Sequence, residues 1–213
     1  LWGSSFEGDW HPPYGPWVEA LGDVARSLDP ARLRRDLGAG APVLARLLPE
    51  LAATLGDVPA PAPLGPEEER FRLFDAVAQF LVAVARHRPV VLVLDDLHWT
   101  DRDSLQLLAY CGRFVARTGL VLVGAYRDAP LDLGDPLADT LAVLCRQDGY
   151  EHLALGGLSP GEVADYLARA TRQPPPAALV RAIHAETGGN PFYLRQLWRH
   201  LVDERVAVQQ HGR

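Results

Sequence analysis

The sequence predicts an α/β fold, in which helices cover a parallel sheet, followed by a small all-helical segment. Continuous aliphatic runs at 90–94 and 120–126 alternate with segments whose apolar residues recur at helical spacing. Unbroken aliphatic runs of this kind are typical of strands buried in a parallel sheet. After Leu158 only helical patterns follow. A boundary between the two parts is therefore expected near residue 158.

The first part alternates between strand patterns and helix patterns. Its longest predicted helix carries Phe74, Val77 and Leu81 on one face, and an acidic first turn that suits the positive end of the helix dipole. A stretch rich in Pro, Ala and Gly at 57–66 indicates a loop. In chain order we expect a strand end at 1–5, a helix at 13–28, one or two short helices within 30–51, a helix at 67–86, a strand at 90–94, a helix at 101–117, a strand at 120–126, a helix at about 135–146 and a strand at 150–158.

The second part begins with a strong helix-start signal. Ser159 is suited to an N-cap, a proline follows it, and Glu162 stands three residues on. Two further helices are expected at 176–187 and from Asn190 through Leu201. The sequence therefore predicts an α/β core at 1–158, a helical domain at 159–205, and the start of a linker or next domain at 206–213.

Composition restricts the class of protein. The chain has 213 residues and a formal net charge of -6, which argues against a surface dominated by nucleic-acid contacts. No apolar run approaches the length of a membrane span, and the first residues do not resemble a secretion signal. Cys111 and Cys145 lie in predicted helices and are expected to be buried free thiols in a cytoplasmic protein.

Two adjacent carboxylates end the strand predicted at 90–94. In the run VVLVLDD they are Asp95 and Asp96, and ligands of open parallel sheets gather at the carboxyl ends of strands. One carboxylate there can hold Mg²⁺ through water, and a neighbouring one can orient an attacking water. The alternative is that the pair only caps the following loop and helix.

The longer segment VVLVLDDLHWTD resembles the Walker B segment of the STAND class of AAA-related P-loop ATPases. It is especially similar to those of large LuxR-type transcriptional regulators and of bacterial cyclase- or kinase-linked sensors. LVLVGAYRD at 120–128 resembles the next strand of that family, and HAETGGNPFYLRQL at 184–197 resembles its helical-lid motif. The resemblance covers nearly the whole chain, and it implies a P-loop NTPase-like sheet, a helical lid, and ATP and Mg²⁺ as cofactors.

Site residues follow from the resemblance at the matching positions. Asp95 would hold Mg²⁺, and Asp96 stands where many members have a catalytic glutamate. Aspartate is one methylene shorter, so slow hydrolysis is expected, which suits a switch. Arg127 would reach the γ-phosphate; the alternative is a surface arginine paired with Asp128.

The helical-lid motif places Asn190 and Pro191 near the adenine base. The alternative is structural, because Gly188 and Gly189 can end one helix while Asn190 and Pro191 start the next. The two interpretations are compatible. His98 belongs to the Walker B segment but receives no chemical role from the sequence.

One departure from the family is decisive. All 21 basic residues are arginine, so the phosphate-binding loop G-x-x-x-x-G-K-[ST] is absent. In the family this loop follows a first strand that lies between the strands predicted here at 120–126 and 150–158. The chain has no methionine and starts with Leu1, and we expect it to be truncated, lacking that strand and loop. Exposed strand edges, poor stability and weak ATP binding would follow.

The leading hypothesis is an ATP-binding and hydrolysing signalling switch domain of a multidomain LuxR-type transcriptional regulator, inactive as this fragment. Its partners would be ATP and other domains of the same polypeptide, with self-association left open and no nucleic-acid or membrane contact. Alternatives are a degenerate module serving as a protein-interaction scaffold, an ATPase domain attached to a cyclase or kinase sensor, or a transition-metal hydrolase using Asp95, Asp96 and His98.

Overall fold

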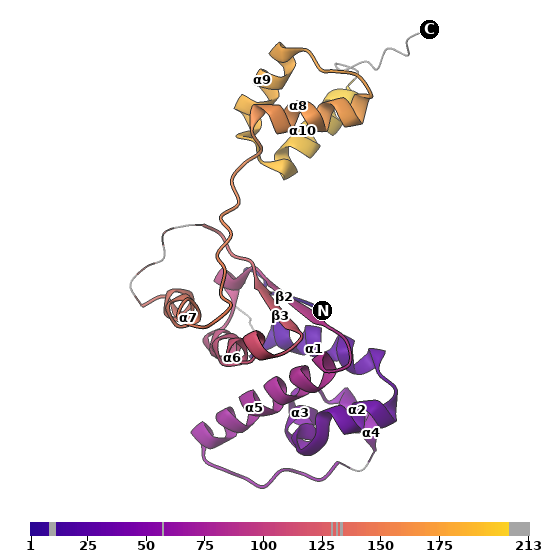
Figure 1. The fold of residues 1–213 in the computed structure, drawn as a ribbon, viewed down its shortest axis with the longest axis vertical. Coiled ribbons are helices and arrows are strands. Elements are labelled where there is room, and N and C mark those ends of the chain that lie inside the picture. The colour runs from indigo at the N-terminus through magenta and orange to yellow at the C-terminus, as the bar shows by residue number, and fades with distance from the viewer. Residues whose placement is uncertain (9–11, 57, 129, 131, 133, 205–213) are drawn as a thin grey trace. The chain divides into compact units, whose positions relative to one another are not determined.

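The computed structural model describes residues 1–8, 12–56, 58–128, 130, 132 and 134–204. The chain forms two compact units, Leu1–His152 and Leu153–Arg213 (Figure 1). The position of one unit relative to the other is not determined. The predicted linker at 206–213 lies outside the described residues.

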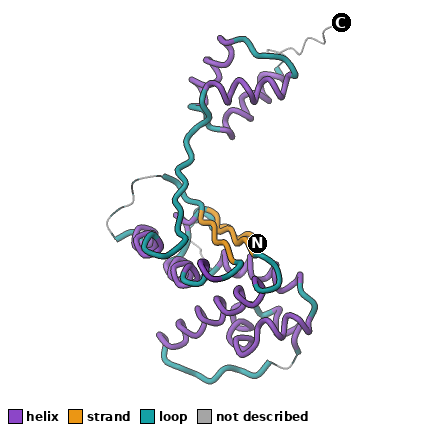
Figure 2. The backbone as a smooth tube through the Cα atoms, in the orientation of Figure 1, coloured by secondary structure: helices purple, strands orange, loops and turns teal. Residues whose placement is uncertain are grey.

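The first unit is built on a three-stranded parallel sheet with the strand order β1-β2-β3. In the register, Gly3 pairs with Leu94, and Leu94 pairs with Gly124. The prediction of an α/β fold with a parallel sheet is therefore confirmed: β1 and β3 lie within segments predicted as strands, and β2 extends one residue past the predicted 90–94. The strands, orange in Figure 2, are β1 (Trp2–Ser4), β2 (Val90–Asp95) and β3 (Leu120–Gly124).

Helices fill the connections between the strands. Asp29 starts one of them by accepting a hydrogen bond from the Arg32 N–H at 3.0 Å, and Asp101 starts another by accepting from the Ser104 N–H at 2.9 Å. The helices are α1 (Gly15–Ser27), α2 (Pro30–Leu37), α3 (Ala41–Leu47), α4 (Glu50–Leu55), α5 (Pro66–Ala85), α6 (Arg102–Gly112) and α7 (Pro136–Leu144), with 3₁₀ turns η1 (Gly38–Gly40), η2 (Leu97–Trp99) and η3 (Val115–Arg117).

Only one face of this sheet is covered by the described residues. Leu92, Leu94 and Leu120 lie on that face and are at most 2% exposed. The strand order follows the chain order, so right-handed crossovers place all the connecting helices on one face, and α1, α5 and α6 lie on one side of the sheet in Figure 1. The register places on the other face a row of apolar side chains that are 42–50% exposed, namely Trp2, Val91, Val121 and Val123.

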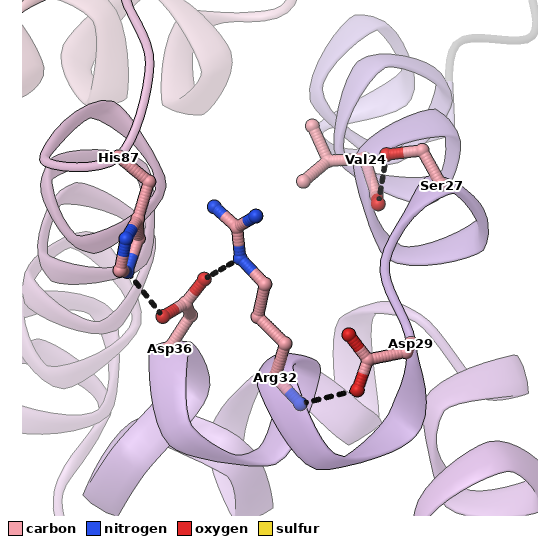
Figure 3. A network of polar contacts seen from close by, with 6 residues as sticks. All are labelled: Val24, Ser27, Asp29, Arg32, Asp36 and His87. Carbon is pink, nitrogen blue, oxygen red and sulfur yellow. Dashed lines mark hydrogen bonds and ion pairs between the residues drawn. The ribbon is translucent and has the colours of Figure 1, made fainter.

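A buried carboxylate ties α2 to the end of α5. Asp36 is 9% exposed and accepts a hydrogen bond from Arg32 Nε at 3.3 Å (Figure 3). Its other oxygen lies 3.6 Å from Nε2 of His87, directly after α5. Arg32 Nη2 is buried and has no hydrogen-bond partner among the described residues. Asp36 is therefore the principal compensation for the buried guanidinium.

The strand predicted at 150–158 is absent, which corrects that prediction. The segment has no regular structure, and Leu153 and Leu155 are 72% and 93% exposed. A strand needs a neighbour that exchanges backbone hydrogen bonds with it, and no described strand lies beyond β3 to do so. The division between the two units, at His152 and Leu153, falls within this segment.

The second unit is a small helical bundle. Ser159 and Glu162 form the expected capping box: Ser159 Oγ accepts from the Glu162 N–H at 3.3 Å, and Glu162 Oε2 accepts from the Ser159 N–H at 2.8 Å. The helices are α8 (Pro160–Thr171), α9 (Ala177–Thr187) and α10 (Pro191–Asp203). Their common core consists of Val163, Leu167, Val180, Ile183 and Leu194.

The two cysteines differ. Cys111 is fully buried in α6 as a free thiol, which confirms the prediction for this residue, and burial raises the pKa of its thiol. Cys145 directly follows α7 and is exposed, so the prediction was wrong for this residue. In the described part of the chain, no helix combines the length and apolar character that a membrane span needs.

Gly3 allows the start of α1 to approach β1. A Cβ atom at Gly3 would stand 2.0 Å from the backbone oxygen of Pro16. We expect Gly3→Ala to lower the free energy of unfolding by roughly 1–3 kcal/mol, because the backbone has to move. Urea denaturation followed by tryptophan fluorescence measures this. Gly15→Ala is the control, since its nearest contact would be an ordinary 3.6 Å; equal losses in both variants would contradict the argument.

Asp36→Ala should destabilise the first unit by roughly 1–3 kcal/mol, because it leaves the largely buried Arg32 guanidinium without its carboxylate. Asp23→Ala removes a carboxylate from an ion pair with Arg26 in which both side chains are more than half exposed, and it should cost less than about 0.5 kcal/mol. Chemical denaturation of both variants tests the difference. A similar cost for the two would show that burial of Asp36 is not what makes its ion pair important.

Candidate functional site

The carboxyl ends of the three strands lie side by side at one edge of the sheet. Ser4 pairs with Asp95, and Leu94 pairs with Gly124. The Ser5 N–H donates to the Asp95 carbonyl at 3.2 Å and extends the pairing past the end of β1. Because the strands are parallel, the segments that follow each of them start from this same edge.

Asp95 is half-buried at the end of β2. Its Oδ1 accepts a hydrogen bond from the backbone N–H of Asp96 at 3.0 Å. This bond orients the carboxylate at the edge of the sheet. The second oxygen has no hydrogen-bond partner among the described residues, so it remains able to accept from a metal-bound water.

Asp96 makes the sharp turn out of the strand. Its backbone is left-handed, with φ 56° and ψ 45°, a conformation that aspartate tolerates better than most residues. The side chain is 50% exposed, and its Oδ1 lies 3.8 Å from Nε2 of His98. The carboxylate of Asp96 is therefore accessible, in contrast to the more sheltered carboxylate of Asp95.

Packing of Leu97 determines the path of this turn. Leu97 is 2% exposed, and its N–H donates to the Ala125 carbonyl at 2.9 Å. The Ala125 N–H in turn donates to the Leu94 carbonyl at 2.9 Å. A Cβ atom at Gly124 would stand 2.6 Å from a methyl group of Leu97, so a larger residue at this position would force the buried leucine to shift. The ends of β2 and β3 are thus locked together.

His98 and Trp99 connect Asp96 with Arg127. The ring centroids of His98 and Trp99 are 5.0 Å apart, and the guanidinium carbon of Arg127 lies 5.8 Å from the centroid of the Trp99 ring. Such a cation–π contact stabilises by about 0.5–1 kcal/mol at an exposed site. The expected alternative, an ion pair between Arg127 and Asp128, does not occur among the described residues. Asp95, Asp96 and Arg127 therefore belong to one edge of the sheet.

The sequence assigned His98 a role only in the transition-metal alternative and none in the nucleotide site. Both of its ring nitrogens are buried without a hydrogen-bond partner among the described residues. Its side chain is 14% exposed and lies beside Asp96. An unsatisfied buried polar group costs about 1–3 kcal/mol, so this placement calls for an explanation. The signal in the sequence was the position of His98 two residues after Asp96, within the Walker B-like segment.

Asn190 and Pro191 lie in the second unit, which is not positioned relative to Asp95. Asn190 is the N-cap of α10, where its Oδ1 accepts from the N–H groups of Phe192 at 2.9 Å and Tyr193 at 3.4 Å. Before them, α9 ends at Gly188, which has a φ of 57°. The structural interpretation of this motif is therefore confirmed, and the expected contact with a nucleotide base stays a prediction.

A cavity of about 250 Å³ opens at the carboxyl edge of the sheet. Ser4, Glu19 and Trp99 contribute to its wall, and the hydroxyl oxygens of Ser5 and Thr100 lie 2.5 Å apart within it. Its volume is below the roughly 300–1,000 Å³ typical of small-molecule pockets. Among the described residues there is no group of three or more His, Cys, Asp or Glu side chains arranged to hold a metal ion, so the transition-metal hypothesis gains no support.

Comparison with known proteins identifies the family. Neither the curated proteins nor the solved structures that were searched contain a match to this chain. A family model described as an AAA ATPase domain matches residues 3–123, which is more than half of the chain. The match includes β2, the turn with Asp95 and Asp96, and most of β1 and β3. The chain therefore belongs to the AAA ATPase domain family.

Proposed function

We propose that this chain is part of an ATP-dependent signalling switch, with ATP and Mg²⁺ as its ligands. It carries the residues that bind Mg²⁺ and orient the attacking water. The observation that carries the proposal is the shared sheet edge, where Asp95 and Asp96 follow β2 and Arg127 follows β3. Members of the AAA ATPase family generally bind ATP with Mg²⁺, and the family match covers both carboxylates.

The three side chains have different roles in this proposal. Asp95 is held in place by the Asp96 N–H and would bind Mg²⁺ as a hard anion, directly or through water. Mg²⁺ supplies positive charge that neutralises the phosphates. Asp96 is half exposed and orients the attacking water, while Arg127 pairs with the terminal phosphate. Asn190 and Pro191 pack near the base.

The residues present fit the metal and not the phosphate chain. Asp95 has an oxygen available, but the chain contains no lysine, and the cavity at the edge, about 250 Å³, is too small for a nucleotide. We therefore propose that a phosphate-binding loop precedes Leu1 in the full-length protein. Its absence from residues 1–213 would explain why the site has residues suited to Mg²⁺ but none that hold the phosphates.

The incomplete sheet supports the same proposal. The edge of β3 is unpaired among the described residues, and Val121 and Val123 expose one face of that strand. A parallel sheet is normally covered on both faces. A strand, a phosphate loop and a helix placed beside β3 would pair its edge, cover the bare face, and give Leu153 and Leu155 a neighbour.

The context we propose is a cytoplasmic, multidomain LuxR-type transcriptional regulator of the STAND class. It rests on the resemblance of VVLVLDDLHWTD, LVLVGAYRD and HAETGGNPFYLRQL to that class. An ATPase domain attached to a cyclase or kinase sensor fits the same segments. A scaffold without turnover is the second candidate function, and the missing lysine is the observation that favours it.

Residues 1–213 alone should bind ATP with a dissociation constant of about 1 mM or weaker, because nothing cradles the phosphates. A longer chain that includes an upstream G-x-x-x-x-G-K-[ST] loop should bind at least about a hundredfold more tightly, and only with Mg²⁺. Isothermal titration calorimetry of both chains measures this difference. Tight, Mg²⁺-dependent binding by residues 1–213 alone would contradict the proposal. An upstream region without such a loop would favour the scaffold.

In that longer chain, Asp96→Asn should lower ATP turnover by about 10²-fold and change ATP affinity less than about threefold, because a carboxamide cannot take the proton of the attacking water. Phosphate release and calorimetry measure the two quantities. The matched control is Asp128→Asn, which removes an exposed carboxylate beyond β3. If both variants retained wild-type turnover, Asp96 would have no role in hydrolysis.

A further inference from the structure

A second cavity lies away from the carboxylates of the candidate site. It occupies about 490 Å³ between α3, the first two turns of α5, the start of α6 and Tyr14. Neither Asp95, Asp96 nor Arg127 contributes to its wall. The charged side chains that line it are three arginines, Arg46, Arg70 and Arg72, and two acidic residues, Glu69 and Asp103.

The arginines in this arginine cavity are only loosely compensated. Arg46 and Arg72 share a single oxygen of Glu69, at 3.4 Å and 3.9 Å. Arg70 lies 3.9 Å from Asp103. Close ion pairs between guanidinium and carboxylate groups are about 2.7–2.9 Å long and often bidentate. The two carboxylates therefore leave much of the hydrogen-bonding capacity of the three guanidinium groups unused.

Arg72 is held in place while one of its donors is left over. Its Nη1 donates to the Ala62 carbonyl at 2.9 Å, which fixes the guanidinium against the loop before α5. Its Nε is buried and has no hydrogen-bond acceptor among the described residues. This buried N–H does not face the cavity, but the bond to Ala62 holds the guanidinium in place, so binding an oxyanion through the accessible part of the Arg72 side chain costs little further entropy.

The rest of the wall is apolar and aromatic. Val43, Leu47 and Leu73 line the cavity together with Tyr14. Burial raises the pKa of Tyr14 to about 12, and Asp103 and Asp101 add to this shift, so its phenol remains protonated at neutral pH. A bound molecule would therefore meet cationic donors on one side and apolar surface on the other.

We propose that the arginine cavity binds a small organic anion, with a phosphate monoester or carboxylate group on the guanidinium groups and an apolar body against Val43, Leu47 and Leu73. A phosphate monoester is tetrahedral and a carboxylate is planar, but each presents two anionic oxygens that a guanidinium group can bind through two parallel hydrogen bonds. A nucleic acid does not fit, because three arginines on a chain of net charge -6 cannot follow a phosphate backbone. The proposal does not depend on the ATP site.

Calorimetric titration of residues 1–213 with phenyl phosphate, benzoate and phenol at low ionic strength tests the proposal. We expect one anionic probe to bind saturably with a dissociation constant below about 1 mM, and phenol to bind at least about tenfold more weakly. Tighter binding of phenyl phosphate would identify a phosphate monoester, and tighter binding of benzoate a carboxylate. Saturation by neither anion, or equal binding of phenol, would overturn the proposal.

Charge-matched variants locate the binding. Arg72→Gln and Arg46→Gln should each weaken the better anion about tenfold, whereas Arg35→Gln, an exposed position on α2 outside the cavity, should change it less than about twofold. Arg46 is 60% exposed, so its replacement does not threaten folding. Glu69→Gln should tighten anion binding more than Glu67→Gln does, because of these two glutamates Glu69 lines the cavity and pairs with Arg46 and Arg72. Equal effects of Arg35 and Arg46, or of the two glutamates, would overturn the proposal.

Discussion

The pairing of β2 with strands on both sides is the constraint on which the first unit depends. It places Asp95 beside Ser4 and brings Gly124 next to Leu94, so the ends of three segments distant in sequence meet at one edge. The same pairing determines how the helices pack. Because strand order follows chain order, the crossovers cover one face and leave the other exposed. The pairing of β2 with β1 and β3 thus explains both the meeting of the candidate site residues at one edge and the exposure of one face of the sheet.

The turn after β2 contains features that cost free energy locally, unlike the regular strand that precedes it. Asp96 adopts a left-handed backbone, and His98 is packed without partners for its ring nitrogens among the described residues. Such costs persist where the surrounding structure determines the conformation, and they tend to cluster at functional sites. Here the determining contact is Leu97, which is buried beneath Gly124 and bonded to Ala125. The residues with unfavourable local conformation or packing, Asp96 and His98, therefore lie at the same sheet edge as the candidate site.

Much of the fold follows from local patterns. Some features depend only on neighbours within a few residues, so they can be predicted from the sequence. Examples are the aliphatic strands, the capping box at Ser159, and the helix starts at Asp29 and Asn190. The segment 150–158 was mispredicted for the converse reason. Its composition suits a strand, but a strand exists only with a partner, and none of the described strands borders it.

By itself the sequence determined the two aspartates, their place at the end of an aliphatic strand, and the absence of any lysine that could hold a phosphate. These are properties of residue type and short spacing. Only the tertiary structure decided that Arg127 lies over Trp99 rather than pairing with Asp128, and that Arg46, Arg70 and Arg72 converge on one cavity. The same holds for the ring nitrogens of His98, which are buried and have no hydrogen-bond partner among the described residues. Those arrangements join α3, α5 and the ends of β2 and β3, and contacts between elements far apart in the chain leave no periodic signal in the sequence.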